Sequence, residues 1–282
     1  MNGPNTSGAV AGALPPNAPP ALAEKHAALQ AHLRSIPRVL VAFSGGADSA
    51  FLVRVAHFTI GERARAAIGI SPSLQQESRD LARELVRSWG VALLEVHPRE
   101  MEDPGYVANG PDRCYYCKHA LYGLLATIAA AAEEGEQVLD GTNRDDLSDD
   151  RPGRVAAAEH GVRSPLAELG WTKREIREAS RLLGIPTWDR PASPCLSSRI
   201  PHGTSVTVSA LRRIEEAEGR IRRHGFADVR VRHLAGTARV EVPAAEVDRL
   251  RSLWTRIEPE LRECGYDEVV LDPAGYRRGG AR

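Results

Sequence analysis

Short, continuous apolar runs alternate with longer stretches of helical periodicity from about residue 23 to residue 184. Continuous apolar runs bounded by turn residues are typical of strands that are buried on both faces. Runs of this kind predict strands at RVLVAFS (38–44), RAAIGIS (65–71), VALLEVHP (91–98) and QVLDGTN (137–143). The stretches around them predict helices at 23–36, 48–60, 75–90, 119–135 and 173–184. This alternation predicts an α/β fold with a parallel sheet covered on both faces.

The pattern changes after the irregular, proline-marked segment 185–203, which we interpret as a site loop. Beyond it, periodicity predicts a smaller α+β domain with helices at 209–225 and 244–265 and strands at 228–234, 238–243 and 267–272. At the other end, residues 1–22 are rich in Pro, Ala, Gly and Asn without apolar periodicity. We therefore expect a disordered tail (1–22), an α/β domain (23–200) and a C-terminal α+β domain (201–282).

Composition narrows the class of protein. The 282 residues are 42% hydrophobic and 26% charged, and the 37 basic residues equal the 37 acidic ones. A net charge of zero argues against a protein whose main function is to bind the phosphate backbone of a nucleic acid. No apolar run approaches the roughly 18 to 20 residues that span a bilayer, and no signal-peptide pattern opens the chain. We expect a cytoplasmic protein with no membrane partner.

The segment SGGADS (44–49) follows the first predicted strand and opens a predicted helix. A glycine pair there lets the backbone turn tightly, so that several N–H groups point at one anion at the positive helix end. Ser44 and Ser49 add hydroxyl donors, and Asp48 either caps the helix or helps to hold Mg²⁺. The loop lacks the GxxxxGK(S/T) and GxGxxG patterns. The plainer interpretation is that Gly45 and Gly46 only make a turn.

The segment VAFSGGADSAFL resembles the pyrophosphate loop (PP-loop) of the ATP pyrophosphatase superfamily, whose domains have an adenine nucleotide alpha-hydrolase-like fold. The resemblance implies that ATP is cleaved between its α and β phosphates, giving a substrate–AMP intermediate and pyrophosphate. It places adenine near Ile70 and Ser71, at the end of the second strand. The end of the fourth strand would line the same crevice with Gly141, Thr142, Asn143 and Asp145, as expected for a parallel sheet.

Four further segments, DRCYYCKHALY, LDGTNRDDLSDDRPG, RSPLAELGWTKREIR and RPASPCLSSRIPHGTSVT, resemble a narrower family. It comprises the ATP-dependent sacrificial sulfur transferases (LarE-like) that help to make the nickel-pincer cofactor of lactate racemase. The match runs from about Val39 to Gly275. It implies adenylation of a carboxylate of pyridinium-3,5-dicarboxylate mononucleotide and its conversion to a thiocarboxylate. The resemblance also implies a homo-oligomer.

Cys195 is the candidate sulfur-carrying thiol, because Ser198 and Arg199 follow it in the site loop and a cationic neighbour favours the thiolate. By resemblance, Cys195 either surrenders its own sulfur and becomes dehydroalanine or joins Cys114 and Cys117 in holding a 4Fe-4S cluster. Three thiolates leave one iron open for an extra sulfide, which favours the cluster. Cys114 and Cys117 could instead form a redox pair or, with His119, part of a zinc site. Cys264 is expected to be structural.

Arg230 and Arg232 alternate along a predicted strand, so both side chains project from one face and can converge on a phosphate, with Glu218 orienting one of them. The resemblance assigns these three residues, with Ser198 and Arg199, to the substrate phosphate and the sulfur-transfer pocket. An exposed arginine face is the alternative. Lys118 and Lys173 are further candidate contacts to phosphate or to the adenylate.

These residues together predict an ATP-dependent sulfur transferase with ATP and Mg²⁺ as cofactors and a small nucleotide-like substrate. Two alternatives stay open at this point. One is a tRNA thiolase of the same superfamily, against which the neutral charge argues. The other is a nucleotide sensor that has kept the loop and lost the chemistry, against which the Cys195 loop argues.

Overall fold

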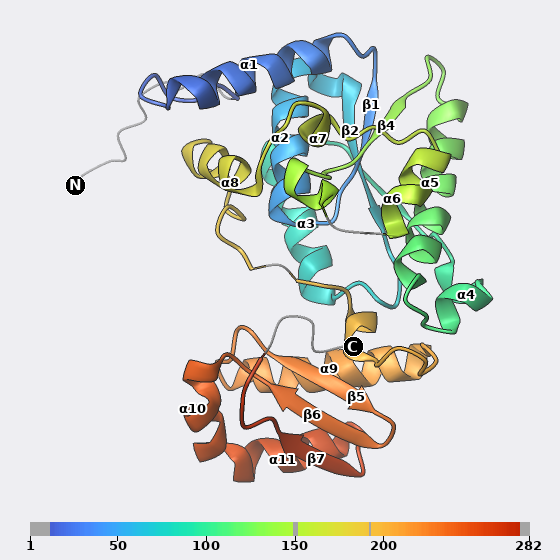
Figure 1. The fold of residues 1–282 in the computed structure, drawn as a ribbon, viewed down its shortest axis with the longest axis vertical. Coiled ribbons are helices and arrows are strands. Elements are labelled where there is room, and N and C mark those ends of the chain that lie inside the picture. Colours follow the sequence, from blue (N-terminus) through green and yellow to red (C-terminus); the bar gives the residue numbers. More distant parts are fainter. Residues whose placement is uncertain (1–11, 149–151, 192, 277–282) are drawn as a thin grey trace. The chain divides into compact units, whose positions relative to one another are not determined.

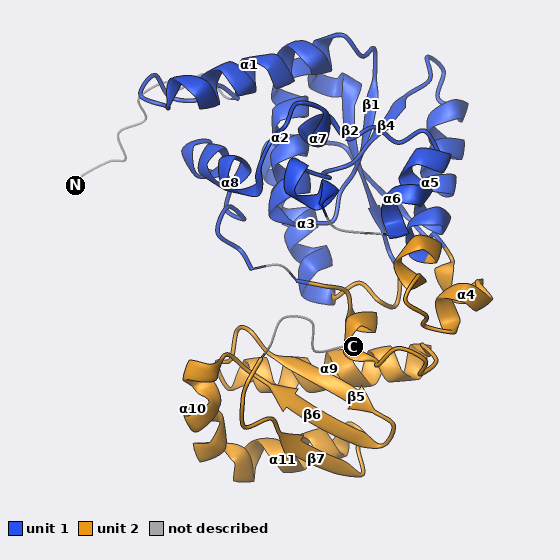
Figure 2. Ribbon diagram, viewed as in Figure 1, with its two compact units in different colours: residues 1–70, 76–98, 117–193 blue, residues 71–75, 99–116, 194–282 orange. Residues whose placement is uncertain are grey.

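The computed structural model describes residues 12–148, 152–191 and 193–276, and they form two compact units (Figure 2). The first unit is built from residues 1–70, 76–98 and 117–193, and the second from residues 71–75, 99–116 and 194–282. The second unit therefore begins at Pro194 in the C-terminal part of the chain and also takes in two short segments from the first half. The expected tail falls partly on residues 1–11, which lie outside the described residues.

The first unit contains a four-stranded parallel sheet in the order β3-β2-β1-β4. Its strands are β1 (Val39–Ala42), β2 (Ala64–Gly69), β3 (Leu93–Val96) and β4 (Gln137–Leu139). Val39 pairs with Ala64 on one side and with Gln137 on the other. All four residues of β1 are buried, as its continuous apolar run predicts. Because the chain passes from β1 to β2 and β3 and then returns to β4, the topological switch point lies between β1 and β4.

Helices cover both faces of this sheet, as predicted. Figure 1 shows α2 and α3 on one side of the strands and α5 and α6 on the other. Helix α2 also packs against α1 and α8, and the Phe51 ring lies 5.0 Å from the Trp171 ring in this core. The helices of the unit are α1 (Pro20–Arg34), α2 (Ala47–Ile60), α3 (Gln76–Trp89), α5 (Arg113–Ala131), α6 (Pro152–Glu159), α7 (Pro165–Glu168) and α8 (Lys173–Leu182), except that the first turn of α5, up to Tyr116, belongs to the second unit.

The second unit carries a three-stranded sheet in the order β5-β6-β7. Strands β5 (Arg230–Leu234) and β6 (Thr237–Glu241) form an antiparallel hairpin, and β7 (Glu268–Leu271) is parallel to β6. Its helices are α4 (Pro104–Val107), α9 (Val208–Arg223), α10 (Val247–Ser252) and α11 (Trp254–Glu263). The apolar core of this sheet and its helices includes Ile221, Phe226, Val231, Val240, Leu250 and Ile257.

Three predicted boundaries were wrong. Helix α1 begins at Pro20 rather than at Ala23, because proline is well suited to the first turn of a helix and Leu22 is buried. Helix α5 begins at Arg113 rather than at His119, since no Gly or Pro interrupts the chain between Asp112 and Gly123. The predicted helix 244–265 is divided at Leu253, where Leu253 and Trp254 both pack against the core of the second unit.

Candidate active site

The loop between β1 and α2 presents an open helix N-terminus. Gly45 has a positive φ of 74°, and a Cβ on it would lie 3.2 Å from the Ser78 carbonyl oxygen. Gly46 is the N-cap of α2, and no side chain in the described part of the chain caps the helix there. The first N–H groups of α2 thus keep their capacity to bind an anion, and the positive end of the helix dipole favours it.

Ser44 and Ser49 support this loop from within. Their hydroxyl oxygens lie 3.1 Å apart, and the Ser44 N–H donates to Ser49 Oγ at 3.2 Å. The Ser49 hydroxyl also donates to the Gly46 carbonyl at 3.3 Å. The sequence analysis expected both hydroxyls to donate to the same anion. In the structure they lie together at the end of β1.

Asp48 and Lys173 meet at the start of α2. Lys173 Nζ lies 3.0 Å from Asp48 Oδ2, while Asp48 Oδ1 is buried and accepts no hydrogen bond from the described residues. The Lys173 backbone N–H donates to Asp145 Oδ2 at 2.8 Å. Asp48 does not cap α2, so its free oxygen is suited to Mg²⁺, which prefers carboxylate ligands.

The end of β4 lies directly against α2. A Cβ on Gly141 would be 2.8 Å from the Ser49 backbone nitrogen, so only glycine fits this close approach. Asn143 caps the turn that follows, accepting from the Asp145 N–H at 2.9 Å, and its buried Nδ2 has no partner among the described residues. Gly141 therefore lies against the start of α2, and Asp145 is linked to Asp48 through Lys173.

The remaining three predicted ATP contacts are Ile70, Ser71 and Thr142. Ile70 continues from the end of β2 and donates its N–H to the Val96 carbonyl at 2.7 Å. Ser71 follows it, and its hydroxyl lies 2.8 Å from the Ser73 hydroxyl. Thr142 donates to Asp140 through both its N–H and its hydroxyl, at 3.1 and 2.8 Å. The role of these residues in binding ATP stays a prediction.

Lys118 has partners that the sequence reasoning missed. Its Nζ lies 4.9 Å from the centre of the Tyr122 ring, and the Tyr122 hydroxyl donates to Asp140 Oδ2 at 2.9 Å. The signal was present in the sequence, because Tyr122 is four residues beyond Lys118 on one helix face and Asp140 directly precedes Gly141. Tyr122 raises the pKa of Lys118, burial lowers it and Asp140 raises it again, so the net direction is upward.

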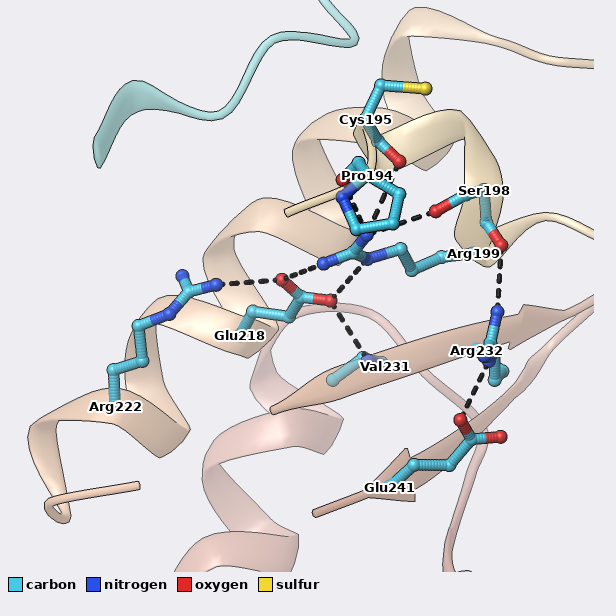
Figure 3. A network of polar contacts seen from close by, with 9 residues as sticks. All are labelled: Pro194, Cys195, Ser198, Arg199, Glu218, Arg222, Val231, Arg232 and Glu241. Atoms are coloured by element: carbon cyan, nitrogen blue, oxygen red, sulfur yellow. Dashed lines mark hydrogen bonds and ion pairs between the residues drawn. The ribbon is translucent and has the colours of Figure 1, made fainter. Parts of the chain in front are cut away.

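In the second unit, Cys195 is exposed at the start of a short 3-10 helix, Leu196–Arg199. The following residue anchors the loop, because the Leu196 N–H donates to the Ser73 carbonyl at 2.9 Å. The Arg199 guanidinium holds it from the other side, donating to the carbonyls of Pro194 at 2.7 Å and Cys195 at 3.3 Å (Figure 3). The accessible, shaped loop expected around Cys195 is present.

The Arg199 cation was expected to lie beside the Cys195 thiol, but its side chain has other partners. Its side chain is buried and forms an ion pair with Glu218 at 2.8 Å. Figure 3 shows the Cys195 sulfur on the side of the loop that faces away from this guanidinium. Because Glu218 neutralises the charge and the remaining N–H groups bind the loop backbone, Arg199 shapes the loop rather than contacting the sulfur.

Glu218 also has other partners than expected. Besides Arg199 it accepts from Arg222 Nη2 at 2.9 Å and from the Val231 N–H at 3.1 Å (Figure 3). The expectation that it orients Arg230 or Arg232 was wrong, because the strand brings the intervening Val231 backbone to it. Glu218 thus ties α9, β5 and the Cys195 loop together.

Arg230 and Arg232 lie on β5 as predicted, with separate partners. Arg232 is buried, donating to Glu241 Oε2 at 2.9 Å and to the Ser198 carbonyl at 2.8 Å (Figure 3). The Arg230 guanidinium lies 3.6 Å from the centre of the Tyr276 ring. Both are therefore held in place rather than freely solvated, which argues against the exposed arginine face.

A second anchor of the Cys195 loop was missed by sequence reasoning. Asn109 is fully buried in the left-handed region, and its Nδ2 donates to the carbonyls of Pro201 and Thr204, both at 2.8 Å. Arg113 donates to Asn109 Oδ1 at 2.6 Å and to the Ser197 carbonyl at 2.9 Å. In the sequence, the Asn-Gly pair at 109–110 is a turn signal, and it does not reveal which carbonyl groups the Asn109 side chain binds. Cys114 directly follows Arg113, so the chain that carries it is tied to the Cys195 loop.

The remaining cysteines differ in exposure. Cys114 is exposed and Cys117, one turn later on α5, is half-buried. Three thiolates have the donor chemistry of a 4Fe-4S site. Within residues 12–148, 152–191 and 193–276, however, no three His, Cys, Asp or Glu side chains are grouped closely enough to hold a metal ion. His119, the candidate additional zinc ligand, lies 3.2 Å from His160.

Comparison with known proteins gives the chain its family. No family model matches. The chain is 42% identical over 247 residues to an uncharacterized protein from Synechocystis, covering 86% of this chain and 91% of the relative. An uncharacterized protein from Methanocaldococcus jannaschii is 27% identical over 240 residues, covering 85% and 91%.

The relative with a described activity is the pyridinium-3,5-bisthiocarboxylic acid mononucleotide synthase of Lactiplantibacillus plantarum. It is 35% identical over 259 residues, covering 92% of this chain and 94% of the relative. Among the described residues, no helix is both long and apolar enough to cross a bilayer. Because the similarity extends over nearly the full length of both proteins, this chain belongs to the family of ATP-dependent sulfur-inserting synthases that includes the Lactiplantibacillus plantarum enzyme.

Proposed function

We propose that the protein adenylates a carboxylate of pyridinium-3,5-dicarboxylate mononucleotide and converts it to a thiocarboxylate for nickel-pincer cofactor synthesis. The observation that carries this proposal is the N-terminus of α2 beside the end of β4. Among the described residues, no side chain caps that helix end, and Asp48 Oδ1 next to it has no partner. That arrangement fits a pyrophosphate and its metal ion at a topological switch point. The printed activity of the Lactiplantibacillus plantarum relative supports the choice of substrate.

The first step activates the carboxylate. One carboxylate oxygen attacks the α-phosphorus of ATP, and the bond to the β-phosphate breaks as pyrophosphate leaves. The N–H groups at the start of α2 hold the leaving pyrophosphate, and Asp48 with Asp145 would hold Mg²⁺, which offsets the charge of the phosphates. Lys118 and Lys173 supply positive charge to phosphate or to the adenylate.

The second step brings in sulfur. In one route, Cys195 Sγ attacks the acyl carbon of the adenylate, AMP leaves with its electron pair, and the thiol proton passes to solvent. Loss of the Cys195 Cα proton then breaks the Cβ–Sγ bond, leaving the thiocarboxylate and dehydroalanine. In the other route, Cys114, Cys117 and Cys195 would hold a 4Fe-4S cluster, which would supply the sulfide. Exposure of Cys195 supports its part in either route.

The substrate phosphate is proposed to bind at β5. Arg230 and Arg232 project from one strand with their guanidinium groups fixed by Tyr276 and Glu241. Ser198 lies in the same network, and Arg199 with Glu218 maintains the loop that carries Cys195. A guanidinium that is already oriented loses little entropy when it binds phosphate.

Anaerobic turnover with mass measurement tests the proposal. Purified protein is incubated with ATP, Mg²⁺ and pyridinium-3,5-dicarboxylate mononucleotide, and pyrophosphate, thiocarboxylate and the intact mass of the denatured chain are recorded. Loss of one hydrogen sulfide from Cys195 supports the sacrificial route. Product with an unchanged chain mass, abolished by Cys114→Ser with Cys117→Ser, supports the cluster. Absence of both pyrophosphate and thiocarboxylate overturns the proposed function, and Cys264→Ser is the matched control.

A further inference from the structure

A buried carboxylate at the end of β4 is linked through a buried tyrosine to a lysine on α5. Asp140 and Tyr122 are 6% and 1% exposed. The Tyr122 hydroxyl donates to Asp140 Oδ2 at 2.9 Å, and Lys118 Nζ lies 4.9 Å from the centre of the Tyr122 ring. These three residues form one line of contacts within the first unit.

Asp140 is held more firmly than one hydrogen bond would hold it. Its Oδ1 accepts from the Ser164 hydroxyl at 2.7 Å and from the Thr142 N–H at 3.1 Å, and its Oδ2 accepts from the Thr142 hydroxyl at 2.8 Å. With Tyr122, four donors converge on one carboxylate. Such a saturated buried network fixes the orientation of each member, so the Tyr122 ring has a defined position beneath Lys118.

The protonation state of Tyr122 suits this arrangement. Burial raises the pKa of Tyr122 to about 12, with Lys118 lowering it and Asp140 raising it. The hydroxyl is therefore a donor to Asp140 throughout the physiological range, and the face of the neutral ring is left to the ammonium. The ammonium of Lys118 rests over a ring, whereas the ammonium of Lys173 is paired with the Asp48 carboxylate. An ammonium has three N–H donors, so the contact of Lys118 with Tyr122 leaves donors for an anionic ligand.

This anchor lies at the end of β4, the strand that pairs with β1, which the pyrophosphate loop follows. Asp140 directly precedes Gly141, whose Cβ, if it had one, would lie 3.0 Å from Ser49 Cα. The register of β4 that brings Gly141 against α2 thus also sets Asp140, and through Tyr122 it sets Lys118. One strand therefore couples the position of the lysine to the position of the nucleotide loop.

We propose that Tyr122 and Asp140 are positioning residues that hold the Lys118 ammonium where it meets an anionic group of the substrate or the adenylate. This inference rests on the proposed function, because it assigns to Lys118 a charged ligand in that reaction. Tyr122 touches neither the ligand nor the reacting atoms and acts through Lys118.

A double-mutant cycle tests the inference. Tyr122→Phe keeps the ring and removes the hydrogen bond to Asp140, and we expect KM for the pyridinium dicarboxylate nucleotide to rise about tenfold with little change in kcat, since a hydrogen bond to a charged group is being removed. In a Lys118→Met background the same change should have no further effect. Tyr266→Phe, which removes a buried hydroxyl in the second unit, is the control with unchanged kinetics.

Two kinetic outcomes overturn the inference. One is a Tyr122→Phe enzyme with the KM of the unaltered protein. The other is an equal loss in the presence and absence of Lys118, which would mean that Tyr122 has only a structural role. Melting temperatures of all variants identify any that fail to fold, and Asp140→Asn gives a second, independent variant of the same link.

A measurement without turnover separates this inference from the proposed function. Isothermal titration follows binding of the pyridinium dicarboxylate nucleotide in the absence of ATP. We expect Tyr122→Phe and Asp140→Asn each to weaken this binding about tenfold, and neither change to have a further effect in the Lys118→Met background. Unchanged affinity in both variants overturns the inference even if the enzyme is active. A loss of affinity that depends on Lys118, in a protein that releases no pyrophosphate, would leave the link intact and overturn the proposed function.

Discussion

The space and the charge around several residues in this protein restrict which side chain can stand there or how it reacts. Gly141 gives β4 its close approach to the Ser49 backbone. Arg199 and Glu218 are a buried ion pair whose remaining polar atoms bind the loop backbone, Arg222 and Val231. The thiol of Cys264 is half-buried while the Cys195 thiol is exposed. Each of these environments predicts a measurable effect of substitution or modification.

Gly141→Ala should weaken ATP binding by about tenfold or more, because a methyl group forced into such a contact costs about 1–3 kcal/mol. It would displace the start of α2, where the pyrophosphate is proposed to bind. Isothermal titration with ATP and Mg²⁺ measures the effect. Gly219→Ala is the control, since a Cβ there meets nothing within 4 Å, and it should bind ATP normally. Equal affinity of both variants would contradict the close contact.

Arg199→Met should lower the free energy of unfolding by about 1.5–3 kcal/mol, because the buried Glu218 carboxylate loses the hydrogen bonds from Arg199 and keeps those from Arg222 and the Val231 N–H. Changing Glu218 to Met as well should recover part of the loss. Urea unfolding measures both. The control Arg251→Met removes an exposed pair with Asp248 and should change stability by about 0.5 kcal/mol or less. A small effect at Arg199 would mean that the pair is not desolvated.

Cys195 and Cys114 should be alkylated by iodoacetamide at pH 8 much faster than Cys264. Both are exposed, whereas burial, ahead of the charge of Glu216, raises the pKa of Cys264 to about 11, so the reactive thiolate is scarce. Peptide mass spectrometry at timed quenches gives the rate at each site. Protein unfolded in urea is the control, in which the rates should converge. Rapid labelling of Cys264 in the folded protein would contradict its burial.

At the scale of elements, helix ends position several residues of the candidate site. Helix α8 begins with a capping box in which Thr172 and Glu175 satisfy each other's backbone N–H groups. Lys25 on α1 reinforces the box, lying 2.8 Å from Glu175 and from the Gly170 carbonyl. Because Lys173 is the first residue of α8, the cap also positions its contacts with Asp48 and Asp145.

Glu175→Gln should cost about 1 kcal/mol of stability at pH 7 through the weakened cap. Burial alone would raise the pKa of Glu175, but hydrogen bonds from Lys25 and Thr172 outweigh it and lower the pKa to about 2. A lowered pKa means that the contribution is complete above the ordinary value of 4.5 and is lost as the pH falls towards 2. The stability difference between the two proteins, measured by urea unfolding from pH 7 to pH 2.5, should therefore shrink. A difference that grows on acidification would contradict this sign.

At the scale of the whole molecule, the chain forms two units, each with its own sheet. The three tryptophans at 89, 171 and 188 belong to the first unit and Trp254 to the second. Each unit has its own core, and the pyrophosphate loop belongs to the first alone. A ligand of that loop should therefore stabilise the two units unequally.

ATP should raise the unfolding midpoint of the first unit more than that of the second, because binding stabilises only the structure that contains the site. Two variants report this by fluorescence in urea, one retaining only Trp171 and one retaining only Trp254. Each variant is measured with and without ATP and Mg²⁺. Buffer that contains Mg²⁺ but no nucleotide is the control. Equal shifts at both tryptophans would show that the molecule unfolds as one cooperative unit.

Much of the first unit could be predicted from the sequence because its signals are local. The apolar run at 39–42 and the glycines at 45 and 46 follow one another directly, so strand, turn and helix can be recognised in order. The partner of Glu218 could not be predicted in this way. Alternation on β5 favoured Arg230 or Arg232, whereas packing of α9 placed the Val231 N–H and the distant Arg199 at the carboxylate.

The sequence by itself determined the order of strands and helices, the position of the pyrophosphate loop and the exposed setting of Cys195, because each depends on residues that are close along the chain. Only the tertiary structure decided that residues 71–75 and 99–116 join the second unit, that Asn109 and Arg113 hold the Cys195 loop, and that Asp140 accepts a hydrogen bond from Tyr122. These contacts join segments that are far apart in the chain. Their pairing is set by how buried polar groups find partners once the cores have packed, and no local pattern encodes it.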